Sequence, residues 1–191
     1  MKKYSAFLIV ALILFFFIAL LMFIFGGTYN KLVELQQNVE EKWAQVENVL
    51  QRRFDLIPNL VEVVKKYAVH EKEIFVKVAE ARAKLAGAKT TTEKVKASQE
   101  LGGFLSRLLV IVENYPNLKA NTVFINLQAQ LEGTENRITV ERKRYNEAVK
   151  EYNTTRNKFP TVFIAGFFGF ERLKPYFKAS EEAQKVPKVE L

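Results

Sequence analysis

The stretch AFLIVALILFFFIALLMFIF, residues 6–25, decides how the rest of this chain of 191 residues is read. All of its side chains are apolar, and a helix rising about 1.5 Å per residue crosses the roughly 30 Å hydrocarbon layer of a bilayer once over this length. A backbone in lipid has to satisfy its own hydrogen bonds, so the run is expected to be helical throughout. We therefore predict a single transmembrane helix over residues 6–26, preceded by a short basic segment, residues 1–5.

A cleaved secretory signal is the competing interpretation, because Lys2 and Lys3 stand ahead of the apolar run. Signal peptides have an apolar stretch of roughly 7–15 residues followed by a small-x-small cleavage site. Here the run is longer and continues into Phe25-Gly26-Gly27-Thr28-Tyr29, so an uncleaved anchor is favoured. The chain has no cysteine, which excludes a lipoprotein attachment site. For the same reason the sequence does not indicate whether the protein lies in an oxidising or a reducing compartment.

The charges beside the predicted span bear on its orientation. Lys2 and Lys3 precede it, whereas its far flank carries no charge until Lys31. The positive-inside rule then favours a cytoplasmic amino terminus and a domain on the outer side of the cell (inner) membrane. The difference is about one charge, so the opposite orientation stays open.

The net positive charge of the chain is consistent with a position beside anionic lipid headgroups. Lysine and arginine number 29 against 21 acidic residues, and the two signs are interleaved along each helical segment. Nucleic-acid binding would need a basic stripe with stacking aromatic residues. We therefore expect membrane lipid as a partner and no nucleic acid.

Beyond the anchor, apolar residues recur at steps of three or four, which predicts amphipathic helices. The first runs over residues 29–54, through Leu32, Leu35, Val39, Trp43, Val46, Leu50 and Phe54. Pro58 lacks an amide hydrogen and disfavours helical geometry at Ile57, so we expect a turn or kink there and a second helix after it. That helix is expected to end near Gly87.

A third helix is predicted after the polar connector of residues 88–92, because Thr90 and Glu93 have the spacing of a capping box. Gly102 and Gly103 lie inside this helix and each lowers its stability by about a kcal/mol relative to alanine. Glycines at that cost indicate that a neighbouring helix approaches closely.

The pattern breaks again at Asn114-Tyr115-Pro116-Asn117, and a longer fourth helix is expected from about residue 119 to 155. Four amphipathic helices with short connections predict an all-α fold with an antiparallel four-helix bundle over residues 29–157. The sequence does not decide whether its proline turns lie at one end of the bundle or at opposite ends.

The segment 158–191 differs in kind. Residues 159–170, FPTVFIAGFFGF, carry five phenylalanines. The segment is too short to span a bilayer and too apolar to be fully exposed to water. We expect this run to be covered by another surface. The contact candidates are Phe163, Phe167, Phe168 and Phe170; the end of the chain, residues 186–191, looks extended.

The sequence supports no catalytic, cofactor or metal site. His70-Glu71-Lys72-Glu73-Ile74 resembles the start of a zinc-binding H-E-x-x-H helix, but Ile74 occupies the position of the second histidine. His70 is the only histidine, which excludes a multi-histidine metal site within one subunit. No phosphate-cradling glycine motif is present, so we expect no enzyme.

A few polar and proline residues stand out where a bundle does not need them. Arg52 and Arg53 lie just before the expected turn and are candidates for partner contact. Short polar side chains satisfy free amides at helix starts, so the plainer interpretation of the asparagines at the breaks is capping. The predicted turn and cap residues are Pro58, Asn59, Asn114, Pro116, Asn117 and Pro160.

These residues together resemble the LemA family of bacterial membrane proteins. The resemblance rests on Tyr29-Asn30-x-Leu32-Val33, Trp43, Arg52-Arg53-x-Asp55-Leu56-Ile57-Pro58-Asn59-Leu60-Val61, Tyr67-Ala68 with His70-Glu71, Ala81-Arg82, Glu113-Asn114-Tyr115-Pro116-Asn117-Leu118-Lys119-Ala120, Leu131-Glu132-Gly133-Thr134-Glu135-Asn136-Arg137-Ile138, Arg142 with Tyr145-Asn146, Tyr152-Asn153, Phe159-Pro160 and Pro187-Lys188-Val189. It implies one amino-terminal membrane helix and a four-helix bundle. It implies no defined reaction, and the family is discussed as a membrane scaffold or as an accessory to membrane protein processing.

Three functional hypotheses follow. The first is a membrane-anchored scaffold that self-associates into a homo-oligomer, with the phenylalanine-rich run touching a neighbouring subunit or the headgroup region. The second is an adaptor that presents clients to a membrane protease or transporter through Arg52, Arg53 and the nearby turn. The third is an enzyme with an unrecognised site, which a bound metal in the purified protein would revive.

Overall fold

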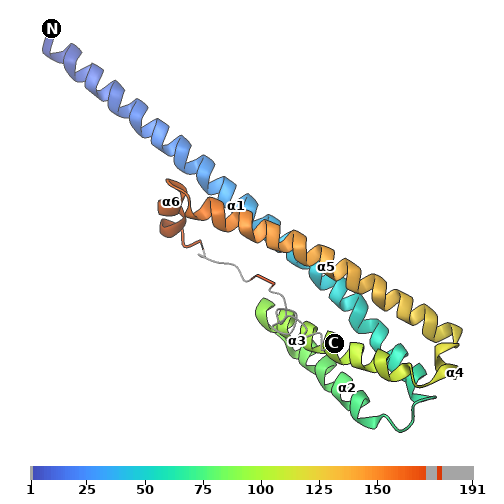
Figure 1. Ribbon diagram of the computed structural model, residues 1–191. Helices are drawn as coiled ribbons and strands as arrows, with labels where there is room; N and C mark the ends of the chain where they lie inside the picture. The colour runs from blue at the N-terminus through green and yellow to red at the C-terminus, as the bar shows by residue number, and fades with distance from the viewer. Residues whose placement is uncertain (1, 171–175, 178–191) are drawn as a thin grey trace, which may run out of the picture. The chain divides into compact units, whose positions relative to one another are not determined.

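The computed structural model describes residues 2–170 and 176–177, and every regular element in that part of the chain is an α-helix (Figure 1). The predicted all-α class is confirmed. The helices are α1 (Lys2–Lys65), α2 (Lys72–Gly87), α3 (Thr91–Val112), α4 (Pro116–Lys119), α5 (Thr122–Asn157) and α6 (Thr161–Phe167). The chain divides into two compact units, one of residues 1–41 and 147–174 and one of residues 42–146 and 175–191.

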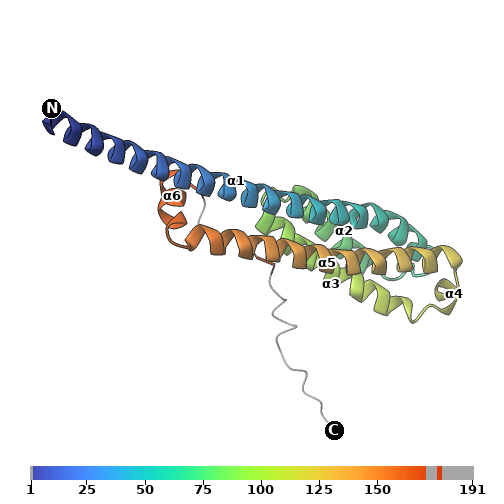
Figure 2. The same cartoon turned by 90° about the horizontal axis from the view of Figure 1, so that it is seen from above.

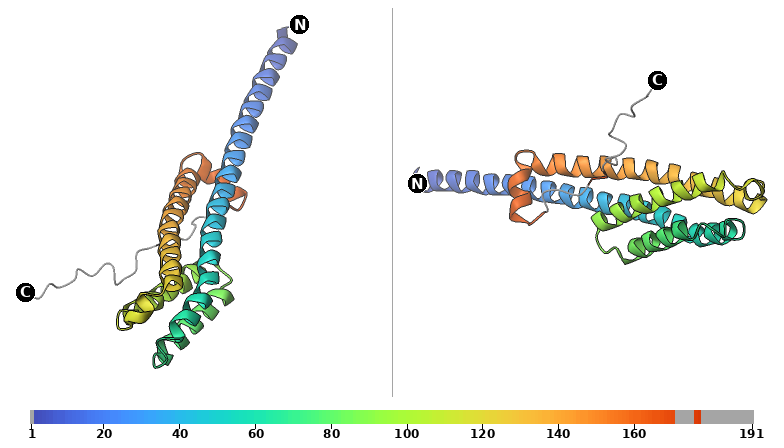
Figure 3. Two further views of the ribbon diagram at one scale, coloured as in Figure 1. Left: turned by 90° about the vertical axis from the view of Figure 1, so that its right-hand side faces the viewer. Right: turned by 60° about the horizontal axis from the view of Figure 1, so that its bottom comes forward.

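The second unit holds the antiparallel four-helix bundle. It is built from the carboxyl-terminal part of α1, from α2 and α3, and from the first part of α5; α2 and α3 lie side by side in the views of Figure 2 and Figure 3. All of these helices, and the short α4, contribute to one apolar core, whose most deeply buried members are Ile57, Leu60, Val64, Ala68, Val78, Ala81, Leu101, Leu108, Leu118 and Phe124.

Of the turn or kink expected at Pro58, the turn is wrong, because α1 continues through it to Lys65. A proline inside a helix costs roughly 3 kcal/mol. The residues around it outweigh that cost, since Ile57, Leu60 and Val64 are each at most 1% exposed and a fully buried side chain of this kind contributes about 1.5–3 kcal/mol. Asn59 also lies inside α1 and caps no helix start, so its predicted role is wrong as well.

The chain instead reverses over residues 66–71, and this turn meets the connections around α4. Tyr115 donates its hydroxyl to Glu71 Oε1 at 3.1 Å, and Asn121 Nδ2 donates to the Tyr67 hydroxyl at 3.1 Å. The reversal at residues 66–71 and the connections around α4 therefore lie at the same end of the bundle.

The break before α4 is confirmed, and its cap residues differ from those predicted. Asn114 lies in the turn, donating its amide to the Ile111 carbonyl at 3.0 Å, and Pro116 begins α4. Asn117 lies within α4 and caps nothing, because the proline before it already occupies the first helical position. The side chain that caps α5 is that of Asn121, whose Oδ1 accepts from Val123 N at 3.0 Å and Phe124 N at 3.1 Å.

The predicted start of α3 is confirmed. The Thr90 hydroxyl accepts from Glu93 N at 3.2 Å, and the Glu93 carboxylate accepts in return from Thr90 N at 3.1 Å. Backbone hydrogen bonds from Lys89 and then Thr90 lower the pKa of Glu93. The end of α2 at Gly87 is also as predicted.

The first unit holds the apolar run of α1 together with the last part of α5 and α6. In the part of the chain that the structure describes, α1 alone is long and apolar enough to cross a membrane, and its apolar window is unburied within the protein. Gly26 and Gly27 lie inside α1, so no helix end separates the run from the residues after it. Pro160 directly precedes α6, as its predicted turn role requires, while the extended end expected at 186–191 lies outside the described residues.

Candidate functional site

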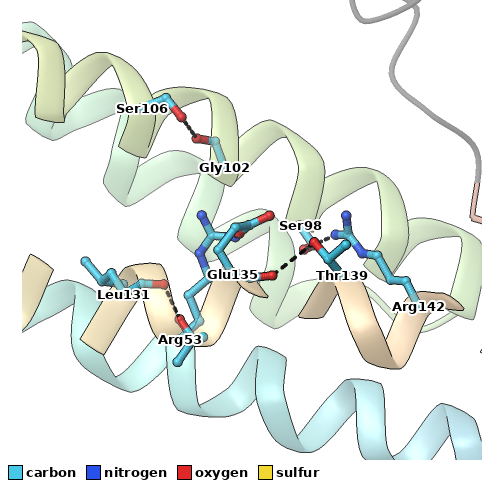
Figure 4. Close-up of polar contacts among 9 residues, drawn as sticks. Arg53, Ser98, Gly102, Ser106, Leu131, Glu135, Thr139 and Arg142 are labelled. Carbon is cyan, nitrogen blue, oxygen red and sulfur yellow. Dashed lines mark hydrogen bonds and ion pairs between the residues drawn. The ribbon is translucent and has the colours of Figure 1, made fainter. Parts of the chain in front are cut away.

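A polar cluster crosses the bundle of the second unit, and its centre is Arg53. Arg53 extends from α1 to α5, where its guanidinium forms a hydrogen-bonded ion pair with Glu135 (Figure 4). About two turns further along α5, Arg142 donates from Nη2 to the hydroxyl of Ser98 on α3 at 3.1 Å. The cluster therefore ties together three helices that are far apart in the sequence.

Burial governs the electrostatics of this cluster. The Arg53 side chain is 10% exposed, whereas that of its partner Glu135 is 47% exposed. Burial lowers the pKa of Arg53, and the adjacent Glu135 carboxylate partly offsets this effect. Burial also lowers the pKa of Arg142, with Glu135 opposing the shift and the positive charge of Arg53 adding to it. Because a guanidinium stays protonated in proteins, one buried and one partly buried cation lie near a single carboxylate, which forms its ion pair with Arg53.

A groove of about 480 Å³ opens beside these residues. A methyl group added at Gly102 would stand 3.6 Å from Arg53 Nη2, which is an ordinary van der Waals contact. The neighbour that approaches Gly102 is therefore a side chain, and nothing lies within 4 Å of a methyl group added at Gly103. The polar residues lining the groove are Arg53, Ser98, Gln99, Ser106, Glu132, Glu135 and Arg142, which can bind a polar ligand through hydrogen bonds and ion pairs.

The two arginines predicted as a contact pair are separated by the helix. Arg52 is exposed on α1, while Arg53 is buried and paired with Glu135. The structure therefore does not bring the two arginines together on one surface. A partner that approached this part of α1 would contact Arg52 only.

Three of the four predicted contact residues, Phe163, Phe167 and Phe168, are exposed in the first unit, whereas Phe170 is only partly exposed. Together with Phe159, which was not among the predicted contacts, these three rings are called the phenylalanine cluster here: Phe159, Phe163, Phe167 and Phe168 are 81%, 68%, 83% and 50% exposed. Phe159 and Phe163 touch edge to face with ring centroids 6.0 Å apart, and Phe167 and Phe168 do so at 5.1 Å. Thr161, Ile164 and Ala165 on the other side of α6 are buried, which fixes the direction of the exposed rings.

Tyr29 connects this cluster to the end of the apolar run. Its ring meets Phe168 at a centroid distance of 4.9 Å and Phe170 at 5.7 Å. Tyr29 follows Phe25 by four residues, about 6 Å along a helix. The phenylalanine cluster therefore lies beside the point at which α1 leaves its apolar stretch.

Glu135, Arg142 and Ser98 were not predicted as site residues, although Glu135 and Arg142 lie in segments that carry the family resemblance. A signal was present for the charged members, because Glu135 stands four residues after Leu131 and three before Ile138, both buried on α5. Arg53 similarly stands three residues after Leu50 and four before Ile57. Charged residues on a buried stripe need partners, but the spacing of one helix does not name a partner on another.

Comparisons with known proteins point to one family. The model described as "LemA family" matches residues 42–191. Magnetosome protein MamQ 2 of Paramagnetospirillum magneticum is 27% identical over 176 residues, covering 78% of this chain and 64% of the relative. Magnetosome protein MamQ of Magnetospirillum gryphiswaldense is 27% identical over 175 residues with the same coverage, so this chain spans 64% of the length of these relatives. Protein LemA of Metamycoplasma hominis is 22% identical over 182 residues, covering 94% of this chain and 81% of the relative.

Proposed function

We propose that this chain, which belongs to the LemA family, is a membrane-anchored scaffold that acts by self-association and carries out no catalysis. Residues 6–26 of α1 hold it in the bilayer, and the phenylalanine cluster is the surface through which copies meet. The single observation that carries the proposal is the exposure of that cluster beside Tyr29.

The exposure of these rings argues for a partner. A fully buried phenylalanine gains roughly 1.5–3 kcal/mol relative to an exposed one, so four exposed rings are a large unused source of binding free energy. Contiguous apolar patches of this kind mark protein or membrane contacts. In a bilayer the anchored copies share a plane, which raises their effective concentration and makes weak contacts sufficient.

The polar cluster of the bundle supports binding over catalysis. Its two arginines are held by partners on other helices, Arg53 by the Glu135 carboxylate and Arg142 by the neutral Ser98 hydroxyl. The names of the relatives place three of them in magnetosomes and state no reaction, so they supply neither a substrate nor a cofactor for this chain.

The test compares subunit numbers in a bilayer. The full chain and the double variant Phe163→Ser/Phe167→Ser are reconstituted in vesicles at equal density, and subunits are counted by single-molecule photobleaching. A matched control, Val110→Ser/Val123→Ser, removes two exposed valines of the bundle. We expect the phenylalanine variant to shift toward monomers and the control to match the parent chain; an unchanged distribution in the phenylalanine variant would overturn the proposal.

We further infer that the chain crosses the cell (inner) membrane once, with its amino terminus in the cytoplasm and the bundle on the outer side. Lys2 and Lys3 on one flank of the run support this orientation. A reporter that is active only outside the cytoplasm, fused after Leu191, should be active. Activity of a cytoplasmic reporter at the same position would reverse the orientation.

The adaptor remains the alternative proposal, resting on Arg52. Arg53 is committed to Glu135, so an acidic client would be held by the exposed neighbour. Photo-crosslinking from position 52 separates the two proposals, because self-crosslinks support the scaffold and a distinct membrane protein supports the adaptor.

A further inference from the structure

A second aromatic site lies in the second unit, and the chain's own Phe177 fills it. Four side chains form what is called the aromatic slot here: Trp43 of α1, and Arg142, Tyr145 and Asn146 of α5. Phe177 stacks on Trp43 with ring centroids 6.0 Å apart and meets Tyr145 edge to face at 5.6 Å. The Arg142 guanidinium carbon lies 4.9 Å from the centre of the Phe177 ring, within the range of a cation–π contact.

Asn146 binds the backbone of the same residue. Its Nδ2 donates to the Phe177 carbonyl at 3.0 Å, and its Oδ1 accepts from the Phe177 amide at 3.0 Å. A residue in extended backbone points its own N–H and C=O to one side, and a strand partner normally pairs with both. The asparagine amide takes the place of that partner, so the slot binds one aromatic side chain and the backbone of the residue that carries it.

This combination is a form of peptide recognition. Backbone hydrogen bonds supply affinity for any extended segment, and a pocket for one side chain supplies the choice of residue. Tyr145 is fixed by the packing of the bundle, since it is 2% exposed, and the other three slot residues are partly exposed around it. Phe177 itself stays partly exposed and the neighbouring Tyr176 is exposed, so the contact is about one residue deep.

We infer that the aromatic slot is a binding site for a peptide segment that presents a phenylalanine in extended backbone, and that in the membrane it takes Phe177 of a second copy of this chain. The second part of this inference rests on the proposed self-association.

A second copy can supply the segment on thermodynamic grounds. The contacts of Phe177 with the slot are the same whichever copy supplies the segment, so only effective concentration decides between them. Anchoring confines the copies to one plane and raises the intermolecular term. Exchange also leaves the bundle intact, because only a shallow contact has to open.

The first arm of the test asks whether the slot binds a peptide. The full-length Phe177→Ala chain, whose slot is open, is titrated with the peptide LKPYFKA, residues 173–179, and with LKPYAKA as the control. Trp43 is the only tryptophan, so its emission reports occupancy of the slot. We expect a saturable change with LKPYFKA, at least fivefold weaker binding in Phe177→Ala/Asn146→Ala, and no saturation with LKPYAKA. Equal responses to the two peptides would overturn the site.

The second arm asks whether the segment comes from another copy. A full-length donor carries the photoreactive p-benzoylphenylalanine at position 177, and a longer tagged receiver carries Phe177→Ala; the two are reconstituted together at increasing density. We expect a donor–receiver adduct that rises with density and falls at least fivefold when the receiver also carries Asn146→Ala. Intrachain adducts alone at every density, or an adduct indifferent to Asn146→Ala, would overturn the exchange.

The two proposals fail separately. If Phe163→Ser/Phe167→Ser does not change the subunit number, the proposed scaffold contact is wrong, and peptide binding by the slot is unaffected by that result. Peptide binding without a donor–receiver adduct would remove the exchange between copies even where the phenylalanine variant lowers the subunit number.

Discussion

Arg53 and Glu135 form one ion pair, but their side chains are 10% and 47% exposed. Removing the carboxylate leaves a buried guanidinium without its partner, which typically costs about 3–5 kcal/mol. Removing the guanidinium leaves a half-solvated carboxylate that water and Arg142 still stabilise. Loss of Glu135 should therefore lower the free energy of unfolding more than loss of Arg53.

We expect Glu135→Ala to lower the free energy of unfolding by roughly 3 kcal/mol, and Arg53→Met, which keeps most of the volume, to lower it by less than about 1.5 kcal/mol. Urea titration of the full chains in detergent, followed by helical circular dichroism, measures both values. Equal losses in the two variants would contradict the expectation that an unpaired buried guanidinium destabilises the fold more than an unpaired, half-exposed carboxylate.

Tyr145 of the aromatic slot makes the stability of the fold depend on pH in alkaline solution. Burial raises its pKa to about 12 from the ordinary 10. Between these values the unfolded chain loses the phenolic proton and the folded chain keeps it, so this contribution to stability is complete below pH 10 and is lost as pH rises to 12.

Relative to Tyr145→Phe, the parent chain should lose roughly 2 kcal/mol of its free energy of unfolding between pH 10 and 12. The comparison with Tyr145→Phe cancels the titration of the other tyrosines and lysines. A difference between the two chains that stays constant over this interval would contradict the shifted pKa.

At the scale of elements, α1 shows tertiary packing overriding a local helix breaker. Pro58 removes one backbone hydrogen bond from the helix, and the buried face formed by Ile57, Leu60 and Val64 keeps the helix intact. Because Pro58 itself is exposed, its replacement disturbs no packing.

Pro58→Ala should accordingly raise the free energy of unfolding by about 1–3 kcal/mol, since alanine restores the missing hydrogen bond and the helix propensity. Thermal unfolding in detergent measures the change. Gly87→Ala, which alters the propensity at a helix end, is the control, and a Pro58→Ala chain no more stable than the parent would mean that α1 relies on the proline.

The helix starts and stops that follow from local chemistry were predictable. Thr90 with Glu93 caps α3 and Gly87 ends α2, because capping depends on residues a few positions apart. The reversal at residues 66–71 carries neither glycine nor proline, so no local signal separated it from the helix before it. Its place is set by long-range hydrogen bonds from Tyr115 and Asn121.

The candidate sites divide in the same way. The exposed phenylalanines are adjacent in sequence, and composition alone identified them. Arg142 and Asn146 act on Ser98 and Phe177, more than 30 positions away, and spacing along one helix cannot predict such partners. A buried arginine on an apolar stripe is the signal that points to such a cluster.

At the scale of the whole molecule, three parts of the chain have separate proposed roles. We propose that the apolar run of α1 attaches the chain to the bilayer, that the aromatic slot of the bundle binds a peptide segment, and that the phenylalanine cluster is an apolar contact. Each surface gains from confinement in a membrane, because two-dimensional tethering strengthens contacts that would be weak between freely diffusing chains.

The most direct test of the central claim is the intact mass of the chain that remains in membranes after a carbonate wash. The account predicts that the chain stays in the pellet and that its mass includes the whole of residues 6–25. A mature chain that begins near Gly27 and leaves with the wash as a monomer would contradict it.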